Sequence, residues 1–162
     1  MNKSPVKKIV RTITALIDNT NDSEHVNYSF LVRPTHQQIN QILDLYQMAE
    51  WWTDGVDDRA QISQLIAKSH CFAIATIGER IIGMGRAISD GISDAYIQDI
   101  TVSESFRRKG IASRIVEELV KKLHEDGLYW IGLIAERGSQ EFYLRLGFKP
   151  MENATPMLRK DS

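Results

Sequence analysis

The sequence has little or none of three features, and each shortage excludes a class of protein. It has one cysteine, Cys71, so no intrachain disulfide can form and a reducing compartment, the cytoplasm, is expected. Its formal net charge is only −1, which supplies no basic field for a nucleic acid. It has no apolar run near the roughly 20 residues that cross a bilayer. We therefore expect neither a nucleic acid nor a membrane as a partner.

What the sequence does contain fits a single globular domain. Its 162 residues are 43% hydrophobic and 25% charged, which is the balance of a folded chain with a core. Cys71 begins an apolar run that ends at Ala75, and this position favours a buried, inert thiol over a nucleophile.

Residues 1–28 differ from the rest and are predicted to form an N-terminal extension. The first 17 residues carry four basic side chains and no acid, and their apolar residues fit either a helix or a strand. A targeting remnant is the alternative to an appended helix or strand. The polar stretch 18–24 is predicted to be a linker, and residues 29–162 are predicted to be the domain that carries the function.

Beyond residue 28, the hydrophobic pattern predicts alternating strands and helices. Thr35 and Gln38 form a capping-box pattern at the start of the first helix. Residues 77–79 supply the turn of an antiparallel hairpin, and Gly147 suits the left-handed backbone just past the last helix. The predicted elements are strands at 29–33, 70–76, 80–89, 95–102, 129–135 and 157–159, and helices near 35–46, 58–66, 111–123 and 139–146. This order predicts a mixed α/β fold.

A basic, glycine-containing turn joins a predicted strand to the strongest predicted helix. It holds three consecutive cations, Arg107, Arg108 and Lys109, followed by Gly110. The first N–H groups of a helix have no intrahelical partner and carry partial positive charge, and a glycine lets a ligand approach the backbone. These features suit a pyrophosphate cradle. Taken alone, however, such a turn favours a solvated basic loop.

Three motifs in this order resemble the GNAT acetyltransferase superfamily. Residues 107–112, Arg-Arg-Lys-Gly-Ile-Ala, match its Arg/Gln-x-x-Gly-x-Gly/Ala signature. Residues 99–102 resemble its fourth strand, and residues 142–148, Phe-Tyr-Leu-Arg-Leu-Gly-Phe, are similar to its Phe-Tyr-x-x-x-Gly-Phe ending. The resemblance covers about residues 29–160. It implies an α/β GNAT fold, with a mixed, largely antiparallel central sheet and helices on both faces, that uses acetyl-CoA as acyl donor and no metal.

The resemblance also implies roles for individual residues. In that family the signature holds the pyrophosphate of acetyl-CoA, and backbone N–H groups of the fourth strand face the thioester, often where the fourth and fifth strands separate. Tyr143 matches the tyrosine that protonates the leaving thiolate, and its alternative role is an aromatic packed beside the CoA arm. The implied cofactor-binding residues are Ile100, Thr101, Val102, Arg107, Arg108, Lys109, Gly110, Ile111 and Ala112.

Asp99 is the candidate general base. Aminolysis of a thioester needs a neutral amine, whereas a free alkylamine is mostly protonated at neutral pH. Asp99 is placed to remove that proton directly or through water, and a structural carboxylate is its alternative role. The other carboxylates that could serve are Asp90, Asp94 and Glu136. Because side chains alternate across a strand, Gln98 and Asp99 are expected to point to opposite faces.

The chain departs from the family pattern after the fifth predicted strand. Many members carry an asparagine there, where this chain has Glu-Arg-Gly-Ser at residues 136–139. This difference puts one side-chain contact to the CoA arm in doubt. Arg137 and Ser139 are the candidates to contact the cofactor instead.

Trp51 and Trp52 are the candidates to bind the acceptor. Paired tryptophans could form an aromatic wall for an amine, helped by cation–π attraction, unless at least one packs into the core. Acidic residues in the neighbouring loops either favour a cationic acceptor or are ordinary solvated charges. They are Asp54, Asp57, Asp58, Asp90 and Asp94.

The predicted function is transfer of an acetyl group from acetyl-CoA to a primary amine of a small molecule, by direct attack in a ternary complex. The alternatives are a protein or peptide N-acetyltransferase and a non-catalytic, regulatory acyl-CoA-binding module. The sequence leaves a homodimer open.

Overall fold

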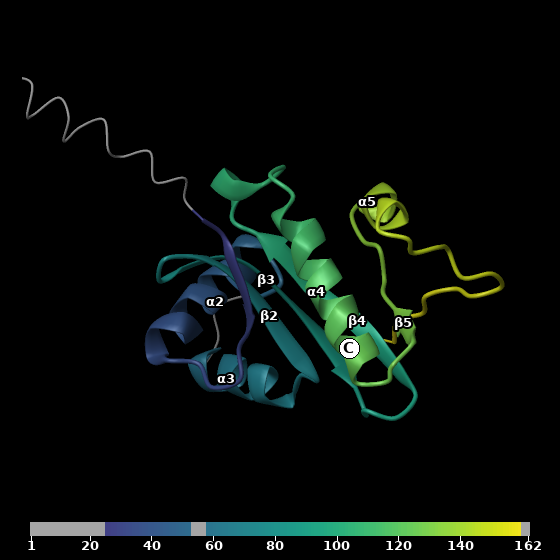
Figure 1. The fold of residues 1–162 in the computed structure, drawn as a ribbon, viewed down its shortest axis with the longest axis horizontal. Coiled ribbons are helices and arrows are strands. Elements are labelled where there is room, and N and C mark those ends of the chain that lie inside the picture. The colour runs from purple at the N-terminus through teal and green to yellow at the C-terminus, as the bar shows by residue number, and fades with distance from the viewer. Residues whose placement is uncertain (1–24, 53–57, 160–162) are drawn as a thin grey trace, which may run out of the picture.

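The computed structural model describes residues 25–52 and 58–159, which form one sheet with helices on both faces (Figure 1). The strands lie in sequence order and are β1 (Asn27–Phe30), β2 (Cys71–Ile77), β3 (Arg80–Ser89), β4 (Asp94–Val102) and β5 (Trp130–Gly132). Neighbours from β1 to β4 are antiparallel, and β5 runs parallel to β4. The predicted mixed, largely antiparallel sheet is therefore confirmed.

The N-terminal extension falls mostly outside the structure, because residues 1–24 are not among the described residues. β1 begins at Asn27 rather than at residue 29. The division of the chain after residue 28 stays a prediction.

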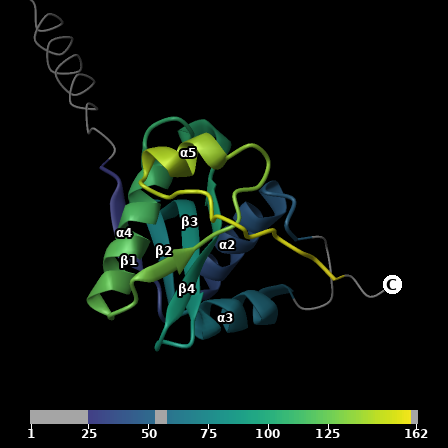
Figure 2. The ribbon, with the colours of Figure 1, turned by 90° about the vertical axis from the view of Figure 1, so that its right-hand side faces the viewer.

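Two helices cover one face of the sheet and one long helix covers the other. Figure 2 shows the strands between α4 (Ile111–Glu125) on one side and both α2 (His36–Met48) and α3 (Asp58–Lys68) on the other. The short α5 (Gln140–Arg145) and the 3-10 turn η1 (Glu104–Phe106) lie near the N-terminal end of α4 in both views. In the described part of the chain, no helix is long and apolar enough to span a membrane.

The predicted helix signals explain how both faces are packed. In α4, apolar residues three and four apart turn one side of the helix to the sheet. The buried positions are Ile111, Ile115, Val116, Leu119 and Leu123. α2 begins at the predicted capping box, in which Thr35 Oγ1 accepts from the Gln38 N–H at 3.2 Å and Gln38 Oε1 accepts from the Thr35 N–H at 2.9 Å.

Two predicted strands differ from the structure. The run 129–135 is a strand only at Trp130–Gly132, because β4 and β5 pair no further than Gly132 and a strand needs a hydrogen-bonded neighbour. The strand predicted at 157–159 is wrong. Within the described residues this segment has no strand beside it, and Met157 and Leu158 are 93% and 79% exposed. Residue preference for strands depends on such neighbours, which the local sequence does not reveal.

A bulge interrupts β4 opposite Gly85. The register between β3 and β4 shifts there, so the single residue Gly85 faces two residues, Asp99 and Ile100. Asp99 has a φ of 58°, in the left-handed region that strand residues avoid. A Cβ at Gly85 would lie 2.3 Å from Cδ1 of Ile100 and 2.9 Å from Cγ2 of Ile115. Glycine therefore leaves the room that the bulged strand needs.

Candidate active site

A cavity of about 620 Å³ opens where β4 and β5 separate. The two strands pair only as far as Tyr96 and Gly132. Beyond this point, β4 residues 97–100 line one side of the cavity, and Leu133 and Ile134 line another. The gap between the fourth and fifth strands that the family resemblance implied is thus present.

Six of the predicted site residues meet in this cavity, although they come from distant parts of the sequence. They are Trp51, Asp99, Ile100, Ala112, Ser139 and Tyr143. The predicted residues outside its lining are Trp52, Thr101, Val102, Arg107, Arg108, Lys109, Gly110 and Ile111. Of these, Thr101, Val102 and Ile111 are buried, so only their backbones could meet a ligand.

The N-terminal end of α4 reaches the cavity through Ala112. Gly110 is the N-cap residue, with a φ of 79°, and no side chain caps the helix. The first N–H groups of α4 are therefore left for an anion. A Cβ at Gly110 would meet no atom within 4 Å, so the space beside this turn is open to a phosphate group.

The three cations of the basic turn differ in their contacts. Arg107 Nε donates to the Val102 carbonyl oxygen at 3.0 Å, which ties the turn to the end of β4. The Lys109 ammonium lies 5.2 Å from the centre of the Phe106 ring. Arg108 makes no hydrogen bond or ion pair within the described residues, and it is exposed. Arg108 is therefore the cation of this turn that is most available to a phosphate group.

Asp99 is held by donors from two other elements. The Tyr46 hydroxyl of α2 donates to Asp99 Oδ2 at 2.7 Å, and Arg86 Nε of β3 donates to the same oxygen. Arg86 Nη2 also donates to Gln98 Oε1 at 2.8 Å. Burial, followed by the charge of Asp99, raises the pKa of Tyr46, so this hydroxyl keeps its proton at neutral pH. Within the described residues, Asp99 Oδ1 has no hydrogen bond and is left for a substrate.

Gln98 and Asp99 share one face of β4, so the prediction that they point to opposite faces is wrong. Both line the cavity, and Arg86 donates to both. The reason is the bulge, because the left-handed backbone of Asp99 breaks the alternation of side chains along the strand.

Tyr143 is half-buried in the lining of the cavity, and its ring packs against two other aromatic rings. Its ring centre lies 4.8 Å from that of Phe142 and 5.9 Å from that of Phe148, both edge to face. Its hydroxyl has no hydrogen-bond partner in the described part of the chain. Burial raises the pKa of Tyr143 above its ordinary value, so the phenol is protonated at neutral pH and can donate a proton.

The two tryptophans take different positions at the end of α2. Trp51 is 38% exposed and lines the cavity, whereas Trp52 packs against the core between α2, α3 and the sheet. Both meet the Tyr46 ring edge to face, with centres 6.2 and 5.8 Å away. The predicted aromatic wall therefore has one member, Trp51. The rest of this loop, with Asp54 and Asp57, lies outside the described residues.

Arg137 joins the loop after β5 to the end of α2. Its Nη1 donates to the Ala49 carbonyl oxygen at 3.3 Å and lies 3.7 Å from Glu50 Oε2. Arg137 and Glu50 both have positive φ angles, of 51° and 58°. Because Arg137 and Trp51 both line the cavity, this contact joins two parts of its lining.

The alternative carboxylates separate into two groups. Glu136 lines the cavity. Asp90 and Asp94 lie outside its lining, at the turn between β3 and β4, where their side chains accept hydrogen bonds from residues of that turn. Glu136 is thus the alternative to Asp99 that the structure leaves.

The single thiol lies away from the cavity. Cys71 is 7% exposed, and burial raises its pKa to about 11, in agreement with the predicted inert thiol. Among the residues that the structure describes, no group of three or more His, Cys, Asp or Glu side chains could hold a metal ion.

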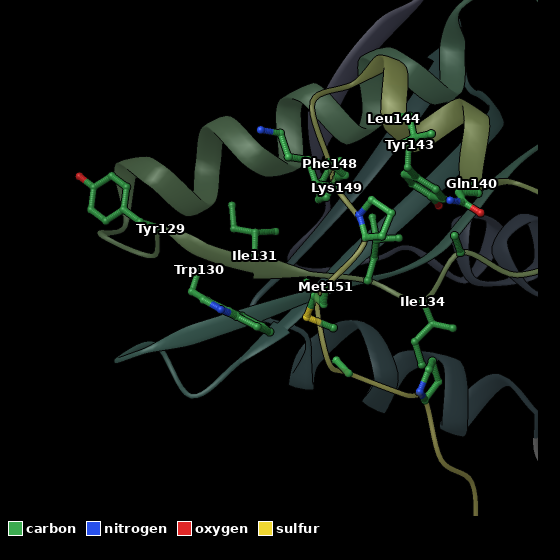
Figure 3. A pocket seen from close by; sticks show the side chains of 16 residues that line it. Tyr129, Trp130, Ile131, Ile134, Gln140, Tyr143, Leu144, Phe148, Lys149 and Met151 are labelled. Carbon is green, nitrogen blue, oxygen red and sulfur yellow. The ribbon is translucent and has the colours of Figure 1, made fainter.

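A second cavity, of about 600 Å³, lies on the outer side of β5. Figure 3 shows Tyr143 and Gln140 extending toward it from α5, with Trp130 and Ile131 of β5 on another side. The two cavities share Leu133, Ile134 and Tyr143. The outer cavity has no carboxylate in its lining, so the cavity between β4 and β5 is the candidate active site.

Three residues of this site were missed by the sequence analysis, namely Tyr46, Gly85 and Arg86. Arg86 carried a signal, because it is a charged residue inside the apolar strand run 81–88 and a buried charge needs a partner. Gly85 lies in the same run, where glycine is unfavourable unless a bulge or close contact requires it. Tyr46 gave no signal beyond its place on the apolar face of α2.

Comparison with known proteins identifies a family and a fold. A family model described as "Acetyltransferase (GNAT) family" matches residues 36–148. The histone acetyltransferase TAP1 of Glycine max is 35% identical over 71 residues, which cover 44% of this chain and 31% of that protein. This chain spans about a third of the length of the curated relatives it matches.

Solved structures agree over most of the chain. A GNAT family acetyltransferase from Streptococcus pneumoniae TIGR4 has a TM-score of 0.69 and 25% identity, covering 85% of this chain and 98% of that one. An aminoglycoside 6'-N-acetyltransferase complexed with coenzyme A has a TM-score of 0.66 and 20% identity, covering 75% and 83%. The latter likeness shows the fold alone.

The comparisons contradict the cytoplasmic location that the sequence predicted. GCN5-related N-acetyltransferases 1 and 2 of Arabidopsis thaliana and serotonin N-acetyltransferase 2 of Oryza sativa subsp. japonica, each 35% identical over 69 to 71 residues, are chloroplastic proteins. The prediction failed because a single cysteine indicates a reducing compartment and does not distinguish one such compartment from another.

Proposed function

The chain belongs to the acetyltransferase (GNAT) family, and we propose that it transfers an acetyl group from acetyl-CoA to a primary amine of a small molecule. The observation that carries this proposal is the cavity between β4 and β5, which brings Asp99 and Tyr143 together and is continuous with the N-terminal end of α4. A carboxylate and a phenol can there act on an amine and a thioester bound in one ternary complex.

Acetyl-CoA is the acyl donor in this proposal. Its pyrophosphate would bind the uncapped N–H groups of α4 and Arg108, and its pantetheine arm would enter the opening between the strands beside Ala112 and Ser139. Two features support this arrangement, namely the open space at Gly110 and the lack of a capping side chain. The solved aminoglycoside acetyltransferase of the same fold was complexed with coenzyme A.

The thioester carbonyl would lie against the backbone at Ile100. This residue lines the cavity just beyond the last pair of β4 with β5. A fixed N–H donor there would stabilise the negative charge that develops on the carbonyl oxygen, an effect that typically contributes about 3–4 kcal/mol.

In the chemical step Asp99 acts as the base for the amine and Tyr143 acts as the acid for the leaving thiolate, and one proton is released to water overall. Asp99 Oδ1 takes a proton from the ammonium group, directly or through water, and the free nitrogen attacks the thioester carbon. The C–N bond forms, the nitrogen releases its second proton to water, the C–S bond breaks, and the thiolate of CoA takes the proton of the Tyr143 hydroxyl. Proton exchange with water then restores Tyr143 and Asp99.

The acceptor class is a small, cationic amine. Trp51 offers an aromatic ring in the lining of the cavity, and Asp99 offers an anionic oxygen there, so an ammonium group would be attracted at both points. The volume of the cavity, about 620 Å³, lies in the range of small-molecule sites, which favours a small molecule over a folded protein. A protein or peptide acceptor is the alternative, because one relative is a histone acetyltransferase.

The homodimer stays a prediction that sedimentation velocity would test.

The test is release of the CoA thiol from acetyl-CoA in the presence of a panel of small amines, amino-terminal peptides and lysine peptides. Cys71 will not disturb a thiol reagent, because it is buried. We expect release that depends on a small amine and falls at least about tenfold in Tyr143→Phe. Tyr129→Phe is the matched control, since that residue is 75% exposed and lies outside the active-site cavity.

Each other result has a definite meaning. Release with peptides alone would replace the small-molecule acceptor by a protein. Binding of acetyl-CoA without release on any amine would support the non-catalytic acyl-CoA-binding module. No binding of acetyl-CoA would overturn the proposal.

A further inference from the structure

We infer that Arg86 is a positioning residue for the acceptor, because one guanidinium fixes both polar side chains that β4 presents to the cavity. The inference rests on the proposed function, in which Asp99 receives the proton of the amine. Arg86 acts through Asp99 and Gln98 and does not line the cavity itself.

The guanidinium of Arg86 forms a fork, meaning that two of its N–H groups donate hydrogen bonds to two different side chains. Nε donates to Asp99 Oδ2, and Nη2 donates to Gln98 Oε1 at 2.8 Å. The side chains of Arg86 and Asp99 are only 17% and 21% exposed, so water screens their attraction less than at the surface. The pair therefore holds more firmly than a surface ion pair would.

The fork explains why a strained backbone persists at Asp99. Arg86 lies directly opposite Gln98 in the register of β3 and β4, and Asp99 is the bulged residue with a φ of 58°. A left-handed residue inside a strand persists only when its surroundings hold it there. Arg86 and Tyr46 supply that hold, because both donate to Asp99 Oδ2.

The arrangement determines which atoms face the acceptor. Since Oδ2 of Asp99 already accepts two hydrogen bonds, Oδ1 is the carboxylate oxygen left for the ammonium proton. Since Oε1 of Gln98 accepts from Arg86, the amide NH₂ of Gln98 is left to donate to an oxygen of the acceptor. The site thus favours an amine that carries a neighbouring hydroxyl or carbonyl oxygen.

A lysine at position 86 could not replace this fork. An ammonium group is a point charge with no planar pair of donors, so it can pair with Asp99 without fixing Gln98. Arg86→Lys and Arg86→Gln therefore separate the charge of Arg86 from its geometry.

The experiment combines these variants with Asp99→Asn in a double-mutant cycle. Asparagine tolerates a positive φ, so it changes the charge and leaves the bulge in place. We expect kcat/KM for the amine to fall about 100-fold in Arg86→Gln and less in Arg86→Lys, while the Kd of acetyl-CoA stays within about threefold. In the Asp99→Asn background, Arg86→Gln should cost at most a further threefold or so, because coupled residues are not additive.

Lys121→Gln is the control. This exposed lysine lies near the C-terminal end of α4, 3.9 Å from Glu125, and outside the lining of the candidate site, and we expect its kinetics to equal those of the parent. Acceptors with and without a hydroxyl beside the amine test the role of Gln98. The Arg86→Lys substitution should lower kcat/KM more for the amine that carries a hydroxyl than for the amine that lacks one.

Three results would overturn the inference. They are full multiplicative losses in the double variant, an equal loss of acetyl-CoA affinity in Arg86→Gln, and unchanged amine kinetics in Arg86→Gln. If the parent protein acetylates no amine, the proposed function fails on its own. The hold on Asp99 is then judged from melting temperatures, in which strictly additive shifts of Arg86→Gln and Asp99→Asn would overturn it.

Discussion

The Tyr46 hydroxyl donates a hydrogen bond of 2.7 Å to Asp99 Oδ2 and thereby connects α2 to the bulge of β4. Tyr46 is 2% exposed, and the rings of Trp51 and Trp52 meet it edge to face. The side chain of Tyr46 therefore couples the position of Asp99, the candidate base, to the positions of the two tryptophans.

Removal of this hydroxyl should loosen the bulge without abolishing it. In Tyr46→Phe, Asp99 Oδ2 keeps its bond from Arg86, so we expect the free energy of unfolding to fall by about 1–2 kcal/mol. Urea unfolding measures this change. Tyr129→Phe, at a 75% exposed site, should change it by less than about 0.5 kcal/mol. Equal values for the two variants would contradict the role of the hydrogen bond.

The pH dependence of turnover tests the state of Tyr143. Burial raises the pKa of its phenol above the ordinary value of about 10. A proton donor works only below its pKa, so the raised value extends its protonated range to higher pH. We expect no alkaline loss of kcat from Tyr143 below about pH 10. An alkaline limb near pH 8 that disappears in Tyr143→Phe would contradict this expectation.

Gly85→Ala tests the packing of the bulge. The new Cβ would lie 2.3 Å from Cδ1 of Ile100 and 2.9 Å from Cγ2 of Ile115, which is itself buried. Overpacking of this kind typically lowers the free energy of unfolding by about 1–3 kcal/mol. Ile100→Val removes the atom that is too close, so the double variant should regain part of the loss in a urea titration. A variant as stable as the parent would show that β4 can relax.

Arg108→Ala tests the proposed pyrophosphate site. Hydrogen bonds to charged groups contribute about 1.5–3 kcal/mol, so the Kd of CoA should rise about tenfold or more, and less at high salt. Lys121→Ala is the control, because this exposed lysine lies near the other end of α4 and pairs with Glu125 at 3.9 Å. Isothermal titration calorimetry measures both. An equal rise in the Kd of CoA in the two variants would show that Arg108 acts only through general charge attraction and not through a specific pyrophosphate site.

Trp51→Ala tests the proposed contact between the Trp51 ring and the acceptor amine. A cation–π contact contributes about 0.5–2 kcal/mol, so KM for a cationic amine should rise about 2- to 30-fold with little change in the Kd of acetyl-CoA. Trp130→Ala is the matched control, because Trp130 is also exposed, at 47%, and lies outside the active-site cavity. A larger effect of Trp130→Ala would move the acceptor to the outer cavity.

Much of the fold was predictable from local sequence signals. The spacing of apolar residues in α4, the capping box of α2 and the glycine turn between β2 and β3 all act over a few residues, and all three appear as predicted. The prediction of a strand at 157–159 failed for the opposite reason. Its residues suit a strand, but strand formation depends on a neighbour that the local sequence cannot reveal.

The sequence by itself determined the motifs of the site, because the basic turn at residues 107–110 and the Phe-Tyr helix are each contiguous in the chain and keep their spacing wherever the chain places them. Only the tertiary structure decided how Asp99 is held. Tyr46, Arg86 and Asp99 come from a helix and two strands, and a bulge opposite Gly85 turns Asp99 to the same face as Gln98. Side-chain alternation predicted the reverse, since a single inserted residue changes the face of a strand without leaving a local pattern.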